Sequence, residues 1–140
     1  MVQLKNLKTS EKLILSFSDF TRIRVMRLFT TTSVELCLCD LTLSLKEPTS
    51  KLSRHLKVLR EAGILHATKE GRWVFHKLLL NEEYLKHLSS MIIAMPDEGK
   101  EFEMDEKHLK RMLQARGYVK CSGTIAVNRK RTFSAKQRKR

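Results

Sequence analysis

Pro48 and Gly63 mark the two ends of one helix, and this constrains the fold of the chain more than any other feature. Pro48 cannot continue the helix before it, and Thr49 or Ser50 can cap a new one. Glycine tolerates the left-handed backbone that commonly ends a helix, which suits Gly63. The apolar residues between these limits recur at the spacing of a buried helical stripe: Leu52, Leu56 and Leu59.

The opposite face of this helix is basic and rich in hydroxyl groups. It carries Ser50, Lys51, Ser53, Arg54 and Lys57, with His55 at its edge, and has no carboxylate before Glu61. Such a face suits a helix that lies in the major groove of DNA and contacts bases and phosphates. The alternative is an ordinary amphipathic helix whose basic face is solvated.

Two short strands follow the helix directly. Residues 64–68 and 73–77 have strand composition, and Gly71 between them tolerates a positive φ in a tight turn. Lys69 and Arg72 then lie at the tip of a hairpin, where they can reach phosphates or the minor groove. The predicted fold class is therefore mainly α with a small β-hairpin wing (α+β), a winged helix-turn-helix.

These segments resemble the ArsR/SmtB family of small winged-helix repressors, and most closely its arsenic-responsive branch. The matching segments are residues 35–41, 52–63 and 70–74, with upstream support from 17–19 and 21–24. The likeness covers about residues 10–95.

The resemblance implies a cytoplasmic prokaryotic regulator that associates with double-stranded operator DNA and is not an enzyme. It also implies a homodimer formed through the first and last helices of the family domain. The sequence predicts that last helix at residues 82–95, with a wide apolar stripe. The alternative is that this stripe packs only on its own core.

Nine residues are expected to contact DNA. We expect base edges and the groove to be contacted by Ser50, Lys51, Ser53, Arg54 and His55. We expect phosphates to be contacted by Thr49, Lys57, Lys69 and Arg72.

Cys37 and Cys39 form a Cys-x-Cys pair within a helix predicted at residues 36–45. Residues two apart on a helix point about 200° away from each other. Binding one soft ion through both sulfurs would therefore require this helix to unwind at its start. Such a distortion would weaken DNA binding by the neighbouring helix, because an effector that prefers the distorted state opposes the DNA-bound one. The motif's resemblance implies trivalent arsenic or antimony as the inducer, with no constitutive cofactor.

The arsenic-responsive motif usually has a third cysteine where this chain has Thr42. Cys121 is the candidate replacement ligand. Other possibilities remain open for the pair: sensing of cadmium or lead, redox sensing through a disulfide, or a vestigial site of two small apolar residues.

The net charge of +13 indicates a polyanionic partner, but its distribution is uneven. Residues 117–140 hold eight of the 28 basic residues and none of the 15 acidic ones. We expect a DNA-binding and dimerisation domain at 1–96, an acidic linker with an accessory helix at 97–116, and a disordered basic tail at 117–140. The linker would span 97–106 and the helix 105–116.

A basic RNA-associated protein is the alternative from another functional class. We expect no membrane-spanning segment, because no apolar run is long enough.

Overall fold

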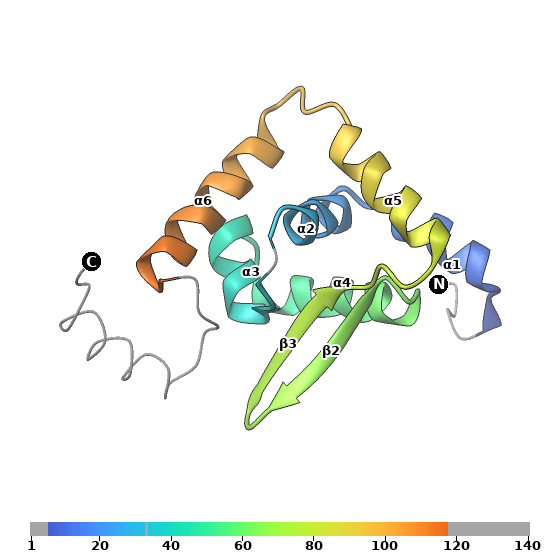
Figure 1. Cartoon of the computed structure of the whole chain (residues 1–140), viewed down its shortest axis with the longest axis horizontal. Helices are drawn as coiled ribbons and strands as arrows, with labels where there is room; N and C mark the ends of the chain where they lie inside the picture. Colours follow the sequence, from blue (N-terminus) through green and yellow to red (C-terminus); the bar gives the residue numbers. More distant parts are fainter. Residues whose placement is uncertain (1–5, 33, 118–140) are drawn as a thin grey trace.

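The computed structural model describes residues 6–32 and 34–117, and within them it forms helices and a small antiparallel sheet (Figure 1). The elements are α1 (Thr9–Ser16), α2 (Phe20–Thr30), β1 (Leu36–Cys37), α3 (Leu38–Leu45), α4 (Thr49–Glu61), β2 (Leu65–Glu70), β3 (Trp73–Leu78), α5 (Glu83–Ala94) and α6 (Glu101–Ala115). Helices α3 and α4 followed by the β2–β3 hairpin confirm the predicted winged helix-turn-helix. Cys121 lies outside the described residues, as does the predicted basic tail after Gly117.

The core surrounds α2, with α5 and α6 above it, α3 to its left and α4 below it in Figure 1. Each of these helices contributes fully buried or nearly fully buried apolar side chains, among them Val25, Met26, Leu41, Leu52, Leu56, Ile92 and Leu109. Burying one such side chain stabilises the fold by roughly 1.5–3 kcal/mol. The stripe predicted on α4 is therefore the contact that holds this helix against the domain.

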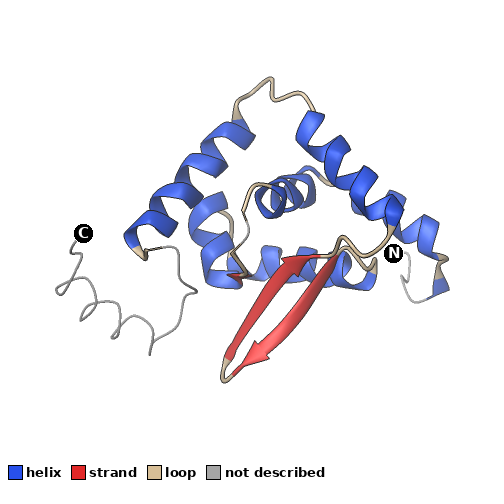
Figure 2. Ribbon diagram, in the orientation of Figure 1, coloured by secondary structure: helices blue, strands red, loops and turns tan. Residues whose placement is uncertain are grey.

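Local signals set the limits of α4 and of the hairpin. Pro48 precedes α4 with an extended backbone, and no side chain caps the helix, so the expected Thr49 or Ser50 cap is absent. Gly63 and Gly71 have φ values of 77° and 64°, as the helix end and the turn require. Strands β2 and β3 pair from Leu65–Leu78 to Glu70–Trp73 and project away from the helices (Figure 2).

Strand β1 is an element that the sequence did not predict. Leu36 pairs with His76 and Cys37 with Phe75, which makes β1 the third strand of the sheet, in the order β1-β3-β2. The helix expected at 36–45 therefore begins at Leu38. Cys37 has φ −94° and ψ 173°, an extended backbone fixed by the pairing with β3.

Helix α6 begins at Glu101, earlier than expected, so the linker predicted at 97–106 is confined to residues 97–100. The Asp97 carboxylate accepts hydrogen bonds from the backbone N–H groups of Phe102 and Glu103, both at 3.0 Å, and so caps the helix. Acidic residues near a helix start are favoured by its dipole. Buried Leu109 and Leu113 join the common core, so this helix packs on the rest of the domain.

Candidate functional site

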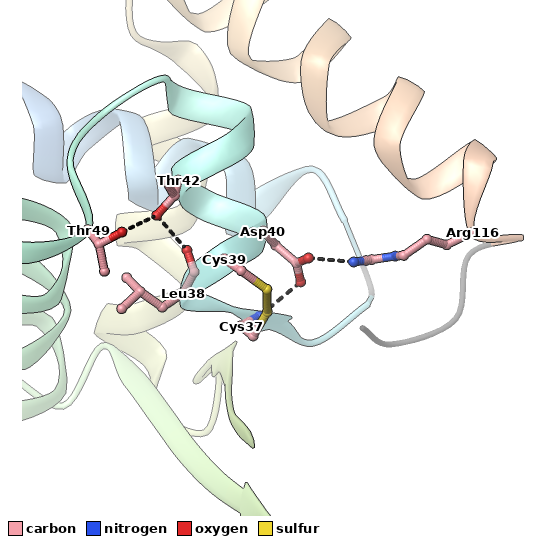
Figure 3. Close-up of a disulfide and its surroundings, with 7 residues drawn as sticks. All are labelled: Cys37, Leu38, Cys39, Asp40, Thr42, Thr49 and Arg116. Carbon is pink, nitrogen blue, oxygen red and sulfur yellow. Dashed lines mark hydrogen bonds and ion pairs between the residues drawn. A yellow bond between two sulfur atoms is a disulfide. The ribbon is translucent and has the colours of Figure 1, made fainter. Parts of the chain in front are cut away.

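Cys37 and Cys39 lie at the junction between β1 and α3. Cys37 is the residue immediately before the helix, Cys39 is within its first turn, and their Cα atoms are 5.4 Å apart. The two sulfur atoms form a disulfide (Figure 3). The expectation that the sulfurs point apart until the helix unwinds is thus wrong, because extended Cys37 is outside the helix. The sulfurs meet without any loss of helical structure.

Asp40 connects this pair to the last turn of the described chain. The Asp40 carboxylate is fully buried, and its Oδ2 accepts the backbone N–H of Cys37 at 2.9 Å. Its Oδ1 forms an ion pair with Arg116, which follows α6 and is itself buried (Figure 3). Asp40 therefore joins α3, the β1 junction and the end of α6.

Within the described part of the chain, one group of potential metal-binding side chains comes together here. The ligand atoms of Cys37, Cys39 and Asp40 all lie within 4.8 Å of one another. Thiolates bind soft metal ions and metalloids, and a carboxylate adds a negatively charged oxygen donor.

The cysteine pair lines a groove of about 850 Å³ between α3, α4 and the hairpin. Thr49, Ser53 and Arg60 of α4 form one wall, and residues of the hairpin, including Arg72 and Trp73, form another. The sequence assigned Thr49, Ser53 and Arg72 to DNA contact. The candidate ligand site and part of the candidate DNA surface thus share one groove.

Most of the residues assigned to DNA contact are exposed: Thr49, Ser50, Ser53, Arg54, Lys57, Lys69 and Arg72. Lys51 is half-buried, and its Nζ lies 2.9 Å from Glu47, which also pairs with Arg24. The hydrogen bond from Lys51 lowers the pKa of the Glu47 carboxyl. The positive charge of Lys51 is therefore balanced by the Glu47 carboxylate.

His55 faces α2 rather than open solvent. Its Nδ1 lies 3.0 Å from Arg22 Nη1, and its Nε2 lies 3.6 Å from the Asp19 carboxylate. Burial lowers the pKa of His55, which favours the neutral ring. This placement gives His55 a role in holding α4 on the domain, and its assignment to DNA contact remains a prediction.

His76 was not among the predicted site residues, yet it lines the same groove. It is only 3% exposed, and its Nε2 lies 3.0 Å from Arg60 Nη1. Burial, followed by the charge of Arg60, lowers the pKa of His76 to about 4. Because Arg60 can only donate, His76 Nε2 accepts and the proton lies on Nδ1. The only sequence signal was a histidine within a strand.

Comparisons with known proteins agree with this architecture. The family model "Bacterial regulatory protein, arsR family" matches residues 19–67. The arsenical resistance operon repressor of Escherichia coli is 30% identical over 106 residues, which cover 76% of this chain and 83% of that repressor. The chain belongs to the arsR family. It is therefore a transcriptional regulator of the winged helix-turn-helix class and not an enzyme.

Other members of the arsR family are similar over shorter stretches. The arsenic resistance transcriptional regulator ArsR1 of Pseudomonas putida is 39% identical over 85 residues, which cover 61% of this chain and 64% of that regulator. A cadmium resistance transcriptional regulatory protein CadC homolog of Staphylococcus aureus is 32% identical over 77 residues, covering 55% of this chain and 61% of the homolog.

The structure of HlyU from Vibrio cholerae N16961 has the same fold, with a TM-score of 0.52 and 24% identity. The similarity covers 60% of this chain and 87% of HlyU. Among the described residues, none of the helices has the length and apolar character needed to span a membrane.

Proposed function

We propose that this arsR-family chain is a metalloregulated repressor that binds operator DNA as a homodimer and leaves it when a thiophilic species binds Cys37 and Cys39. The observation that carries the proposal is the shared groove, which is lined by both cysteines and by Thr49, Ser53 and Arg72. A species bound at the sulfurs would lie beside the surface that contacts DNA.

The proposed DNA interface combines α4 with the tip of the hairpin. Exposed Ser50, Ser53 and Arg54 lie on the free face of α4, where a helix in the major groove meets base edges. Lys69 and Arg72 lie at the hairpin tip, where they contribute phosphate contacts. Lys51 would join this surface in the groove once its ammonium group leaves Glu47 for the DNA.

The homodimer would form through α1 and α5. Exposed apolar side chains on these helices include Ile14, Tyr84, Met91 and Ile93, with exposed fractions of 72%, 43%, 46% and 51%. Exposed apolar residues gathered on helices mark surfaces that another protein surface can cover. The two copies of α4 would then read the two halves of an inverted repeat.

Trivalent arsenic or antimony is the proposed inducer class. Two adjacent thiolates suit such soft species, and several related regulators are named for arsenic resistance. Because one relative is named for cadmium resistance, divalent soft ions are the second proposed inducer class.

The proposed coupling runs through Cys37 rather than through an unwound helix. Cys37 pairs with Phe75 of β3 and also begins α3, so it connects the hairpin with the helix that supports α4. A ligand that shifts Cys37 would change the angle between hairpin and α4. By thermodynamic linkage, DNA then weakens inducer binding by the same factor by which inducer weakens DNA binding.

A gel-shift titration of the reduced protein with arsenite tests this function. Arsenite is expected to release wild type from its operator and to leave a Cys37→Ser/Cys39→Ser variant bound. Cys121→Ser is the companion variant, since an unchanged arsenite response would exclude Cys121 as a ligand. Persistent operator binding by wild type in saturating arsenite would contradict the proposal.

The disulfide favours redox sensing as a second candidate function. Two thiols and one hydrogen peroxide would give the disulfide and two waters, with two electrons passing from sulfur to the peroxide oxygens. Operator affinity measured with peroxide and then with a dithiol reductant tests this candidate. Reversible loss of affinity would support it, and equal affinities of the two forms would contradict it.

A further inference from the structure

We infer that Arg60 and His76 are positioning residues for DNA binding: their hydrogen bond sets the angle of the hairpin on α4, so that Arg72 reaches a phosphate while α4 lies in the major groove. The bond joins Arg60 Nη1 of α4 to His76 Nε2 of β3 over 3.0 Å. This inference rests on the proposed DNA interface, and it depends neither on the cysteines nor on the inducer.

The hairpin is attached to α4 at two levels. At its base, the Ile64 N–H donates to the Leu59 carbonyl oxygen at 3.0 Å, just after the end of α4. Further along the hairpin, Phe75 and His76 are the last buried residues before the tip, since residues 69–74 are half-buried or exposed. An attachment at the base alone would allow the hairpin to pivot, whereas the second contact fixes its angle.

His76 lies where one contact can orient the whole sheet. It belongs to β3, the middle strand, and pairs with Leu36 of β1 on one side and Ala67 of β2 on the other. Arg60 lies in the last turn of α4, and both it and His76 line the groove between α4 and the hairpin. A shift of the His76 ring relative to Arg60 therefore moves the paired strands together.

A small change of angle at His76 becomes a large displacement at the tip. Arg72 precedes His76 by four residues, which at roughly 3.3 Å per residue is about 13 Å of extended chain. A rotation of about 10° would move the tip by about 2 Å, whereas donor–acceptor distances in hydrogen bonds vary by only about 0.5 Å. The phosphate contact of Arg72 therefore depends on the angle that the pair sets.

The chemistry of His76 favours this role over a contribution to stability. The Nδ1 atom of its ring is buried and has no hydrogen-bond partner among the described residues. An unsatisfied buried polar group costs free energy that an apolar side chain of similar size would avoid. The contact that a histidine adds at this position is the bond that its Nε2 accepts from Arg60.

Operator binding by His76→Leu tests the inference, measured on reduced protein without inducer at several salt concentrations. This substitution removes the acceptor of the hydrogen bond but leaves Arg60 and Arg72 in place. Operator affinity is expected to fall by about fivefold to tenfold, and the slope of log affinity against log salt concentration by roughly 0.9, as for one lost phosphate contact. His66→Leu, the same substitution at an exposed position of β2, is the matched control and should change neither.

Two further comparisons identify Arg72 as the group that the pair positions. Arg72→Ala should weaken operator binding in wild type but by less than about twofold in His76→Leu, because the phosphate contact is already lost there. His76→Gln, whose amide oxygen can accept from Arg60, should keep operator affinity within about twofold of wild type. If His76→Leu does not fold, Arg60→Met removes the donor instead and should likewise reduce the effect of Arg72→Ala.

Wild-type affinity and slope in His76→Leu would overturn the role of the pair. So would a loss of stability in chemical denaturation with an unchanged slope, or an equal effect of Arg72→Ala in wild type and His76→Leu. Operator binding that Arg72→Ala does not weaken even in wild type would contradict the proposed hairpin contact as well. Wild type that binds operator but does not respond to arsenite would contradict the inducer assignment alone, because these measurements contain no inducer.

Discussion

Residues of α4 and the hairpin that were assigned to DNA line the same groove as the start of α3. The two regions differ in their burial and in whether near or distant residues fix their structure. The residues assigned to DNA on α4 and the hairpin are mostly exposed, and Pro48, Gly63 and Gly71 set their elements locally. The site at Cys37 is buried and is completed by β3 and by the end of α6. We infer that changes on the first surface act independently on DNA binding, whereas changes at the second alter folding and ligand binding together.

The largest expected effect follows from breaking the buried pair between Asp40 and Arg116. Arg116→Met leaves the fully buried Asp40 carboxylate without its counter-ion, which should lower the free energy of unfolding by about 3–5 kcal/mol. Chemical denaturation measures this loss. Asp40→Asn/Arg116→Met is the control and should recover part of it. A double variant no more stable than Arg116→Met would show that the charge pair is not the cause.

The next effect concerns His76, the buried histidine of the groove. Its pKa is about 4 in the folded protein against 6.5 for an unperturbed histidine side chain, so the folded state binds fewer protons than the unfolded state between these pH values. Stability should be full above pH 6.5 and fall by about 3 kcal/mol as the pH drops to 4. Denaturation midpoints of wild type and His76→Gln across this range measure it. His66→Gln, at an exposed position on β2, is the control and should keep the wild-type pH dependence.

A smaller effect is expected on the exposed face of α4. Arg54→Ala should weaken operator binding by about 1–3 kcal/mol if Arg54 contacts a guanine, and should affect non-specific DNA less. Binding titrations on both DNAs measure this difference. Arg111→Ala, at an exposed position on α6, is the control and should change neither. Equal losses on the two DNAs would assign Arg54 to the phosphate backbone.

The smallest effects are expected at the hairpin tip. Lys69→Ala and Arg72→Ala should each weaken binding to all DNA sequences. Each should also reduce the slope of log affinity against log salt concentration by roughly 0.9, the value for one lost phosphate contact. Affinity measured at several salt concentrations gives this slope. An unchanged slope would remove the residue from the interface.

The sequence predicted the parts of the molecule whose causes are local. Helix α4 and the hairpin follow from a proline, two glycines and an apolar stripe within about thirty residues. At the start of α2, the Asp19 carboxylate accepts the backbone N–H of Arg22 at 3.2 Å, a contact between residues three positions apart. Each of these signals acts between residues a few positions apart, so no knowledge of the fold is needed.

The start of α3 depends instead on partners that are distant in the sequence. Cys37 was expected to be helical, but its pairing with Phe75 makes it extended. The ion pair of Asp40 with Arg116 joins residues 76 positions apart, and the hydrophobic periodicity of the sequence cannot predict such a pair. The acids after Asp97 resembled a linker because their role as a helix start appears only once α6 packs on α2 and α3. The structure gives the positions of the residues assigned to DNA, but their contacts with DNA remain predictions.

The most direct test of the account measures the coupling between the cysteine pair and DNA in both directions. Operator affinity is titrated with and without saturating arsenite, and arsenite affinity with and without saturating operator, on the same reduced protein. We predict that each ligand weakens the other by the same factor, about 5–150-fold, and that the Cys37→Ser/Cys39→Ser variant shows no coupling. Tight arsenite binding by Cys37 and Cys39 with unchanged operator affinity would contradict the central claim.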